Sequence, residues 1–217
     1  MRKHALLNGT SNSPFTGSTE RLEMSDAHLR LAVLTGSAPG SRTGQAVASW
    51  TRHEAINYGQ FDVDLVDVAE DPLPVLITHP PSPAAAQKLE LISPRLAAAD
   101  AFIVVCAEYN HSFPAALKSA VDWHTTEWYA KPVGFVSYGG RSGGLRAVEQ
   151  FRLVFSELHV VTLRDGVSFP NVWEEFDEDG EPRDTVGSHT AAKTMFDQLL
   201  WWSESLREAR QKRPYTP

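Results

Sequence analysis

The sequence has one cysteine, Cys106, among its 217 residues. A single cysteine excludes an internal disulfide framework and a cysteine-rich zinc module. The apolar neighbours of Cys106 predict a buried, unreactive thiol. The eight histidines do not fall at the compact spacings of zinc ligands, so we expect no metal site.

The chain also lacks long apolar runs and an excess of positive charge. No segment approaches the about 20 apolar residues that cross a bilayer. The apolar stretch after the basic start is too short for a secretory signal. We therefore expect no membrane partner and a cytoplasmic location. With 20 basic and 27 acidic side chains the formal charge is −7, which argues against nucleic acid as a partner because such binding needs a basic surface.

The negative charge is concentrated in one segment. Residues 174–184, EEFDEDGEPRD, contain seven acids and one base, a net of −6, which leaves about −1 for all other residues. The Asp-Gly pair within this segment indicates an exposed turn. The local charge elsewhere in the chain therefore allows an anionic ligand.

Composition and length favour one globular domain with short extensions. Hydrophobic residues make up 42% of the chain and charged residues 22%, as in ordinary folded domains. Residues 1–28 include a stretch of Gly, Asn, Ser, Thr and Pro, which predicts an arm that is flexible or docked on a partner subunit. We place the folded domain at 29–208 and a C-terminal tail at 209–217.

Apolar strand-like runs alternate with helical periodicity through this domain. The runs are 30–36, 61–68, 101–107, 132–138 and 159–164. The second run alternates apolar and acidic residues, as an edge strand does, whereas the first, third and fourth are more continuously apolar, as strands buried between two helical layers are. Helical segments follow at 43–57, 84–98, after Pro114, at 145–158 and around 196–206. This alternation predicts a three-layer α/β sandwich with a five-stranded parallel sheet.

In such a sheet, ligands bind beyond the carboxyl ends of the strands, and three loops there have unusual compositions. Residues 36–44, GSAPGSRTG, carry small residues, hydroxyls and Arg42 before a helix, as in a phosphate cradle; the alternative is an ordinary capped turn. Residues 108–114, EYNHSFP, offer amide groups and aromatic faces, and His111 is a weaker candidate. Residues 137–144, SYGGRSGG, contain four glycines that bring peptide N–H groups against a ligand. Together the loops suit a flavin mononucleotide.

Two segments resemble the NADPH-dependent FMN reductase family of flavodoxin-like proteins. They are 108–123, EYNHSFPAALKSAVDW, and 131–144, KPVGFVSYGGRSGG, and the resemblance spans roughly 30–205. It implies strand order 2-1-3-4-5, bound FMN, NADPH as donor with NADH possible, and a homodimer or homotetramer. Family members often carry arginine where this chain has Pro39, so we expect phosphate affinity either to be weaker or to rest more on Ser37 and backbone N–H groups.

The resemblance also assigns the cofactor-binding residues. Ser37, Arg42 and Thr43 are expected to hold the phosphate. The residues expected to border the isoalloxazine are Glu108, Tyr109, Asn110, Ser137, Gly139, Gly140 and Arg141. We hypothesise a further contact of Arg141 with NADPH or the flavin edge.

The chemistry implied is flavin-centred, so no catalytic side chain is expected. Reducing equivalents from NADPH would pass through FMN to a small-molecule acceptor such as a flavin or quinone. The alternatives are a non-enzymatic electron carrier and a flavin-binding partner module. A hydrolase is disfavoured because no Gly-x-Ser-x-Gly motif occurs. Trp201 and Trp202 are a candidate oligomer contact.

Overall fold

The computed structural model describes residues 28–37 and 40–217. The predicted N-terminal arm therefore lies outside the described residues, except for His28, and so does Pro39.

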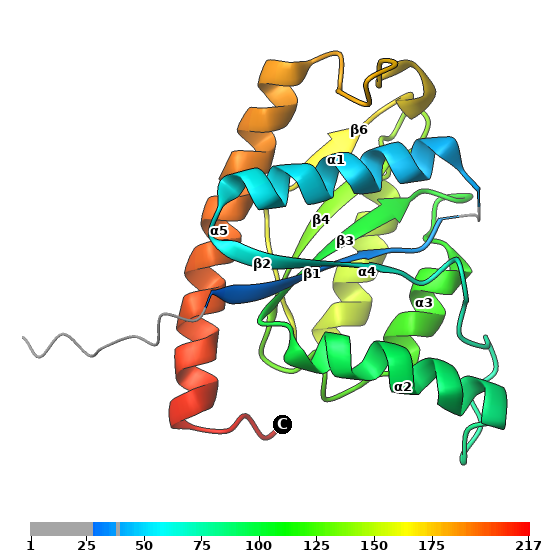
Figure 1. Ribbon diagram of the computed structural model, residues 1–217, viewed down its shortest axis with the longest axis vertical. Coiled ribbons are helices and arrows are strands. Elements are labelled where there is room, and N and C mark those ends of the chain that lie inside the picture. Colours follow the sequence, from blue (N-terminus) through cyan, green and yellow to red (C-terminus); the bar gives the residue numbers. More distant parts are fainter. Residues whose placement is uncertain (1–27, 38–39) are drawn as a thin grey trace, which may run out of the picture.

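A parallel sheet forms the centre of the domain (Figure 1). Its strands are β1 (Leu29–Thr35), β2 (Phe61–Asp67), β3 (Ala101–Ala107), β4 (Pro132–Tyr138), β5 (Val161–Thr162) and β6 (Val167–Phe169). The order is β2-β1-β3-β4-β5, with β6 also paired to β4, and every pairing is parallel. The predicted fold and strand order are confirmed, including β2 as an edge strand.

The fifth strand differs from its prediction at 159–164. It is two short pieces, β5 and β6, which pair with β4 at successive positions of the same edge, at Pro132 and Val133 and then at Val136 to Tyr138. Between them, the Arg152 guanidinium donates to the carbonyls of Leu163 and Arg164. Between β5 and β6, hydrogen bonds from the Arg152 side chain take the place of backbone hydrogen bonds to β4. The apolar pattern of 159–164 did not reveal this interruption of the strand.

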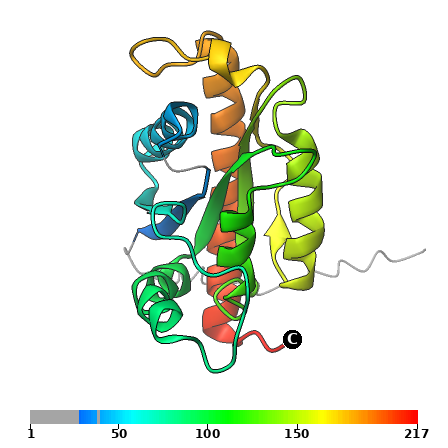
Figure 2. The same cartoon turned by 90° about the vertical axis from the view of Figure 1, so that its right-hand side faces the viewer.

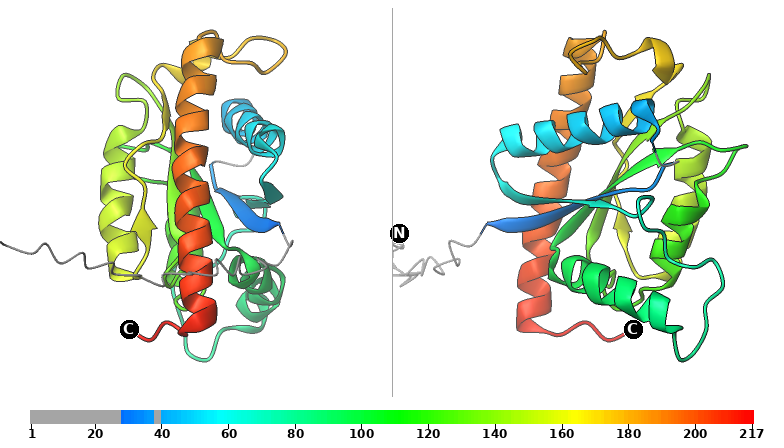
Figure 3. Two further views of the ribbon diagram at one scale, coloured as in Figure 1. Left: turned by 90° about the vertical axis from the view of Figure 1, so that its left-hand side faces the viewer. Right: turned by 45° about the vertical axis from the view of Figure 1, so that its right-hand side comes forward.

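Helices cover both faces of the sheet. They are α1 (Arg42–Tyr58), α2 (Pro83–Ala98), α3 (Ala115–Asp122), α4 (Leu145–Glu157) and α5 (Thr185–Lys212), with a 3-10 turn η1 (Val172–Glu174). Helices α1 and α5 contribute to the hydrophobic cluster on one face, and α2, α3 and α4 to the cluster on the other (Figures 2 and 3). Helix α5 continues to Lys212, so the C-terminal tail begins later than the predicted residue 209.

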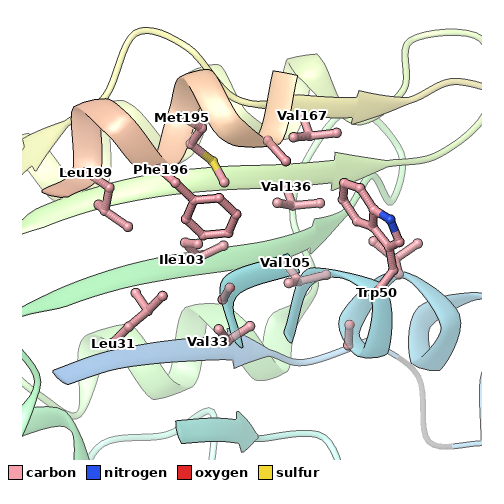
Figure 4. Close-up of a cluster of buried hydrophobic side chains, with 14 of the residues drawn as sticks. Leu31, Val33, Trp50, Ile103, Val105, Val136, Val167, Met195, Phe196 and Leu199 are labelled. Carbon is pink, nitrogen blue, oxygen red and sulfur yellow. The ribbon is translucent and has the colours of Figure 1, made fainter. Parts of the chain in front are cut away.

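The two clusters explain why the middle strands are apolar throughout. On the α1 and α5 face, Ile103 and Val105 of β3 meet Met195, Phe196 and Leu199 of α5 (Figure 4). The alternate residues of β3 face the cluster that contains Phe151 and Phe155 of α4. Burying a side chain of this size contributes about 2–3 kcal/mol. In α4 the inner stripe is Ala147, Val148, Phe151 and Phe155, whereas Leu145, which the periodicity had included, is exposed.

Two tryptophans and the single cysteine pack into the core, and the cysteine is buried as predicted. Trp128 is fully buried between Phe102 and Phe155. Trp202 packs against the core while its neighbour Trp201 is exposed. Cys106 is buried in β3, and burial raises the pKa of its thiol, so the unreactive thiol is in the neutral form.

Candidate functional site

The predicted site residues lie on the three loops that follow β1, β3 and β4 or at the ends of the elements that flank these loops. All three strands run in the same direction, so the loops share one edge of the sheet. The loop after β3 is joined to β4 by a hydrogen bond from Glu108 N to Tyr138 O of 2.9 Å. The side chain of Tyr138 reaches the loop after β1. The structure therefore brings the three loops together, as predicted.

The first loop ends at the N-terminus of α1. Ser41 caps α1 by accepting a hydrogen bond from Gly44 N at 3.2 Å. A Cβ on Gly44 would lie 2.1 Å from Ser37 Oγ and 2.8 Å from Tyr138 Oη. Only glycine fits here, and its absence of a side chain lets both hydroxyls converge on the positive end of α1. Such a cradle suits a phosphate group.

The hydroxyl of Tyr138 is buried next to the side chain of Ser37, and it makes no well-formed hydrogen bond among the residues that the structure describes. Burial raises the pKa of Tyr138 to about 12, so the hydroxyl keeps its proton and can donate. A buried donor without an acceptor costs about 1–3 kcal/mol. An anion held at the start of α1 would supply the acceptor. The sequence analysis missed Tyr138, because its place in an apolar strand resembles that of a core residue.

A cavity of about 770 Å³ lies on the β2 side of the same loop. Its lining includes Ser37 and Gly44 but also Asp67 and Glu70, and no residue of 108–110 or 139–141. Arg95, which also lines it, is engaged by the carboxylate of Asp64 at 2.6 Å and 2.8 Å. The acids make this cavity unfavourable for phosphate. A phosphate is better placed on the Tyr138 side of the loop.

The loop after β3 is a tight hairpin. Tyr109 N donates to Ser112 O at 2.8 Å, and Ser112 N donates back to Tyr109 O at 3.0 Å. The two residues between them, Asn110 and His111, have φ of 51° and 70°, as in a type I′ turn. Asparagine tolerates this left-handed conformation. The turn exposes Asn110 and Tyr109 at the edge of the site, and it accounts for the position of His111 without a catalytic role.

Glu108 directs its carboxylate away from this edge. The carboxylate accepts from Arg146 N at 3.2 Å and from the Arg146 guanidinium at 3.0 Å. Burial would raise the pKa of Glu108, but hydrogen bonds from Ser142 and Arg146 outweigh it and lower the pKa. Since Gly144, the N-cap residue of α4, has no side chain, this carboxylate caps the helix instead. Glu108 can therefore offer its peptide group to the site, while its side chain holds the end of the glycine-rich loop after β4.

The glycine-rich loop after β4 is held from within. Ser137 Oγ donates to Gly143 O at 2.8 Å, and Ser168 Oγ donates to the same oxygen at 2.9 Å. Gly144 has φ of 87°, and a Cβ there would lie 2.7 Å from Tyr138 N. The hydroxyl of Ser137 is thus used inside the loop. Gly139 and Gly140 are half-buried.

The three predicted phosphate residues lie around the start of α1. Arg42 is exposed in the first turn, and Thr43 and Ser37 are half-buried. Arg141, the other predicted cation, is exposed on the glycine-rich loop. Ala38 and Pro39 lie outside the described residues, so the expected effect of Pro39 stays a prediction.

The described residues were compared with the arrangements that metal binding and membrane spanning require. Among residues 28–37 and 40–217, no group of three or more His, Cys, Asp or Glu side chains is arranged to hold a metal ion. The helices over the same residues include none that is long and apolar enough to span a bilayer.

Named relatives match about half of the chain. A NAD(P)H-dependent FMN reductase of Schizosaccharomyces pombe is 31% identical over 121 residues, covering 53% of this chain and 60% of that protein. A NAD(P)H:quinone oxidoreductase of Solanum tuberosum is 32% identical over 135 residues, covering 55% and 64%. The chain thus spans somewhat under two thirds of the length of these relatives.

Solved structures with low sequence identity share the fold. FerB, a flavoenzyme NAD(P)H:(acceptor) oxidoreductase from Paracoccus denitrificans, superposes with a TM-score of 0.66 at 21% identity, covering 82% of this chain and 98% of that one. At this identity the likeness concerns the fold alone. The family model for NADPH-dependent FMN reductase matches residues 29–174, well over half of the chain. By this match, the chain belongs to the NADPH-dependent FMN reductase family.

Proposed function

We propose that the protein is an NAD(P)H-dependent, FMN-containing oxidoreductase that passes reducing equivalents from NADPH to a small acceptor, such as a flavin or a quinone. The observation that carries this proposal is the cradle at Gly44. There, the hydroxyls of Ser37 and Tyr138 converge on the N-terminus of α1. The hydroxyl of Tyr138 is buried and makes no well-formed hydrogen bond among the described residues. Membership of the family supports FMN as the group that the cradle holds.

The residues around the cradle fit FMN in chemistry. Ser37, Thr43 and Arg42 would bind the phosphate together with the N–H groups of α1, and Tyr138 would donate a further hydrogen bond. The ring would be bordered by the peptide groups of Glu108, Tyr109 and Asn110 on one side. On the other side it would meet Ser137, Gly139, Gly140 and Arg141, of which Ser137 acts by holding the loop.

FMN, when bound, supplies the capacity to accept hydride and to deliver it to a second substrate. The chain's own residues would bind the phosphate and orient the edge of the ring. No side chain needs to act as a nucleophile. Relatives named as quinone oxidoreductases support a small planar acceptor.

The test is oxidation of NADPH and of NADH by the purified protein, followed at 340 nm with a panel of flavins and quinones, with and without added FMN. We expect FMN-dependent oxidation with NADPH and at least one acceptor. Flavin absorbance without NADPH oxidation would indicate an electron carrier instead. Absence of both would indicate a module that uses the fold without the cofactor.

The assembly and location of the protein are separate proposals. We propose a homodimer or homotetramer, to which the exposed Trp201 on α5 is a candidate contact. Light scattering coupled to size exclusion at micromolar concentration tests this, and a mass equal to one subunit would contradict it. A cytoplasmic location stays a prediction from the sequence.

A further inference from the structure

An exposed tryptophan stands beside the glycine-rich loop. Trp173, in η1, has 65% of its surface exposed, whereas its neighbour Val172 is buried at 3%. Val172 thus anchors the turn while the indole of Trp173 faces outward. An indole is a large planar surface on which another planar ring can stack.

Three backbone hydrogen bonds tie this turn to the loop. Gly139 N donates to Phe169 O at 3.3 Å, Val172 N donates to Gly139 O at 3.1 Å, and Asn171 N donates to Gly140 O at 2.9 Å. A Cβ on Gly140 would lie 3.5 Å from Cη2 of the Trp173 ring. The indole therefore lies against the bare backbone of Gly140, at a fixed position relative to the predicted flavin edge.

The order of the strands places Trp173 opposite Tyr109. Strand β4 pairs with β3 on one side and with β6 on the other (Figure 1), so the glycine-rich loop follows a strand that is flanked by the strand before Tyr109 and the strand before Trp173. Tyr109 is 44% exposed. Two exposed aromatic rings thus border the loop from its two sides.

The acidic segment continues directly from Trp173. Residues 174–184 fold back on themselves through a bridge between Phe176 and Pro182, and Asp177 accepts hydrogen bonds from Asp179 N at 3.0 Å and Glu181 N at 2.9 Å. We call 174–184 the acidic hairpin. Its exposed acids include Glu174, Glu178 and Asp179, so it adds a negative field next to the indole. The match to the family ends at residue 174, so the hairpin is a feature of this chain beyond that match.

We propose that Trp173 forms an outer wall of the acceptor-binding surface, and that the acidic hairpin makes this surface select uncharged planar acceptors over anionic ones. The inference rests on the proposed function. In the reaction, an uncharged quinone and one proton take the hydride of NADPH to give the hydroquinone and NADP⁺. The indole contributes stacking area for the quinone, and the hairpin raises the energy of a negative substituent at the same place.

The test compares two acceptors that share one ring system, uncharged 1,4-naphthoquinone and its negatively charged 2-sulfonate. At saturating NADPH and low salt, we expect kcat/KM to be at least about tenfold higher for the uncharged quinone, with the difference shrinking as salt screens the hairpin. The variant Glu174→Gln, Glu178→Gln, Asp179→Asn should reduce this difference severalfold. An unchanged preference in that variant would overturn the role of the hairpin.

Trp173→Ala should raise KM for both quinones by about fivefold to tenfold with kcat little changed, because stacking is lost in binding. Trp173→Phe should restore most of the affinity. Tyr215→Ala, which removes an exposed aromatic side chain near the C-terminus, is the control and should leave KM unchanged. Equal KM values for wild type and Trp173→Ala would overturn the role of Trp173.

Two measurements separate this inference from the proposed function. FMN affinity should be the same in wild type and in all these variants. In FMN-free protein, naphthoquinone should quench tryptophan fluorescence more in wild type than in Trp173→Phe. If wild type binds FMN and reduces the quinones but the variants match it, only this inference fails. If wild type neither binds FMN nor oxidises NADPH, both fail.

Discussion

At the scale of single residues, the site depends on one missing side chain and one unsatisfied hydroxyl. Gly44 leaves room at the start of α1 for Ser37 and Tyr138 to converge, and the Tyr138 hydroxyl makes no well-formed hydrogen bond among the described residues. The apoprotein bears the cost of the buried hydroxyl, and a bound phosphate would remove it. Changes at these two positions therefore separate ligand binding from folding.

Gly44→Ala should weaken FMN binding by at least about tenfold, since the new methyl group occupies the space in front of Ser37 Oγ. Because the methyl group also crowds Ser37 in the folded protein, urea unfolding of the apoprotein is measured alongside to separate a loss of affinity from a loss of stability. Titration of FMN fluorescence measures the affinity. Arg52→Ala, at an exposed position of the same helix, is the control. Wild-type affinity in Gly44→Ala would contradict the cradle.

Tyr138→Phe should weaken FMN binding by about tenfold while making the apoprotein more stable by about 1 kcal/mol, because the lost hydroxyl makes no well-formed hydrogen bond until the ligand binds. Urea unfolding of the apoprotein and FMN titration measure the two effects. Tyr58→Phe is the opposite case. Tyr58 donates to Asp197 at 2.9 Å, so its loss should not stabilise the protein or change FMN affinity. A Tyr138→Phe apoprotein less stable than wild type would count against our interpretation.

At the scale of elements, the glycine-rich loop is positioned by a residue from another strand. The carboxylate of Glu108, which follows β3, caps α4 and pairs with Arg146, and so closes the end of the loop that Gly144 leaves uncapped. Charge-assisted hydrogen bonds of this kind are stronger than neutral ones. The element thus has its shape set by contacts distant in sequence.

Glu108→Gln keeps the shape of the side chain but removes its charge, and we expect FMN affinity to fall by about threefold to tenfold. The pKa of Glu108 is lowered in the folded protein from the ordinary 4.5. The stabilisation by its carboxylate is therefore complete above that pH and is lost as the pH falls through the lowered value. FMN affinity measured from pH 7 downward should drop below pH 4.5 in wild type and less in the variant. Glu149→Gln, on the outer face of α4, should behave as wild type.

At the scale of the whole molecule, a lysine at the opposite edge of the sheet links the stability of the fold to pH. Lys131 is 6% exposed, and its ammonium donates to the last carbonyls of α2, to Leu96 O at 3.1 Å and Ala97 O at 3.0 Å. Burial, with repulsion from Arg210, lowers the pKa of Lys131 to about 8. The unfolded chain therefore binds this proton more tightly than the folded protein does.

The free energy of unfolding should consequently rise as the pH increases from about 8 towards 10.5, by up to about 3 kcal/mol from this group. Lys131→Met should lose that part of the rise while keeping the stem packed. Urea unfolding at pH 7 to 10 measures the free energy of unfolding of both proteins. Subtracting the two values at each pH removes the contribution of other titrating groups. Equal pH dependence in the two proteins would show that Lys131 does not titrate as its burial implies.

The sequence by itself determined the layers, the bounds of β3 and β4 and the three loops at one edge, since these depend on local apolar periodicity and on turn chemistry. It did not reveal the broken fifth strand, where Arg152 replaces part of the ladder. Nor did it reveal that Tyr138 reaches the phosphate loop, that Glu108 caps α4, or that Trp173 borders Gly140. Each of these joins residues far apart along the chain. Such contacts follow from the packing of the sheet, and only the tertiary structure decided them.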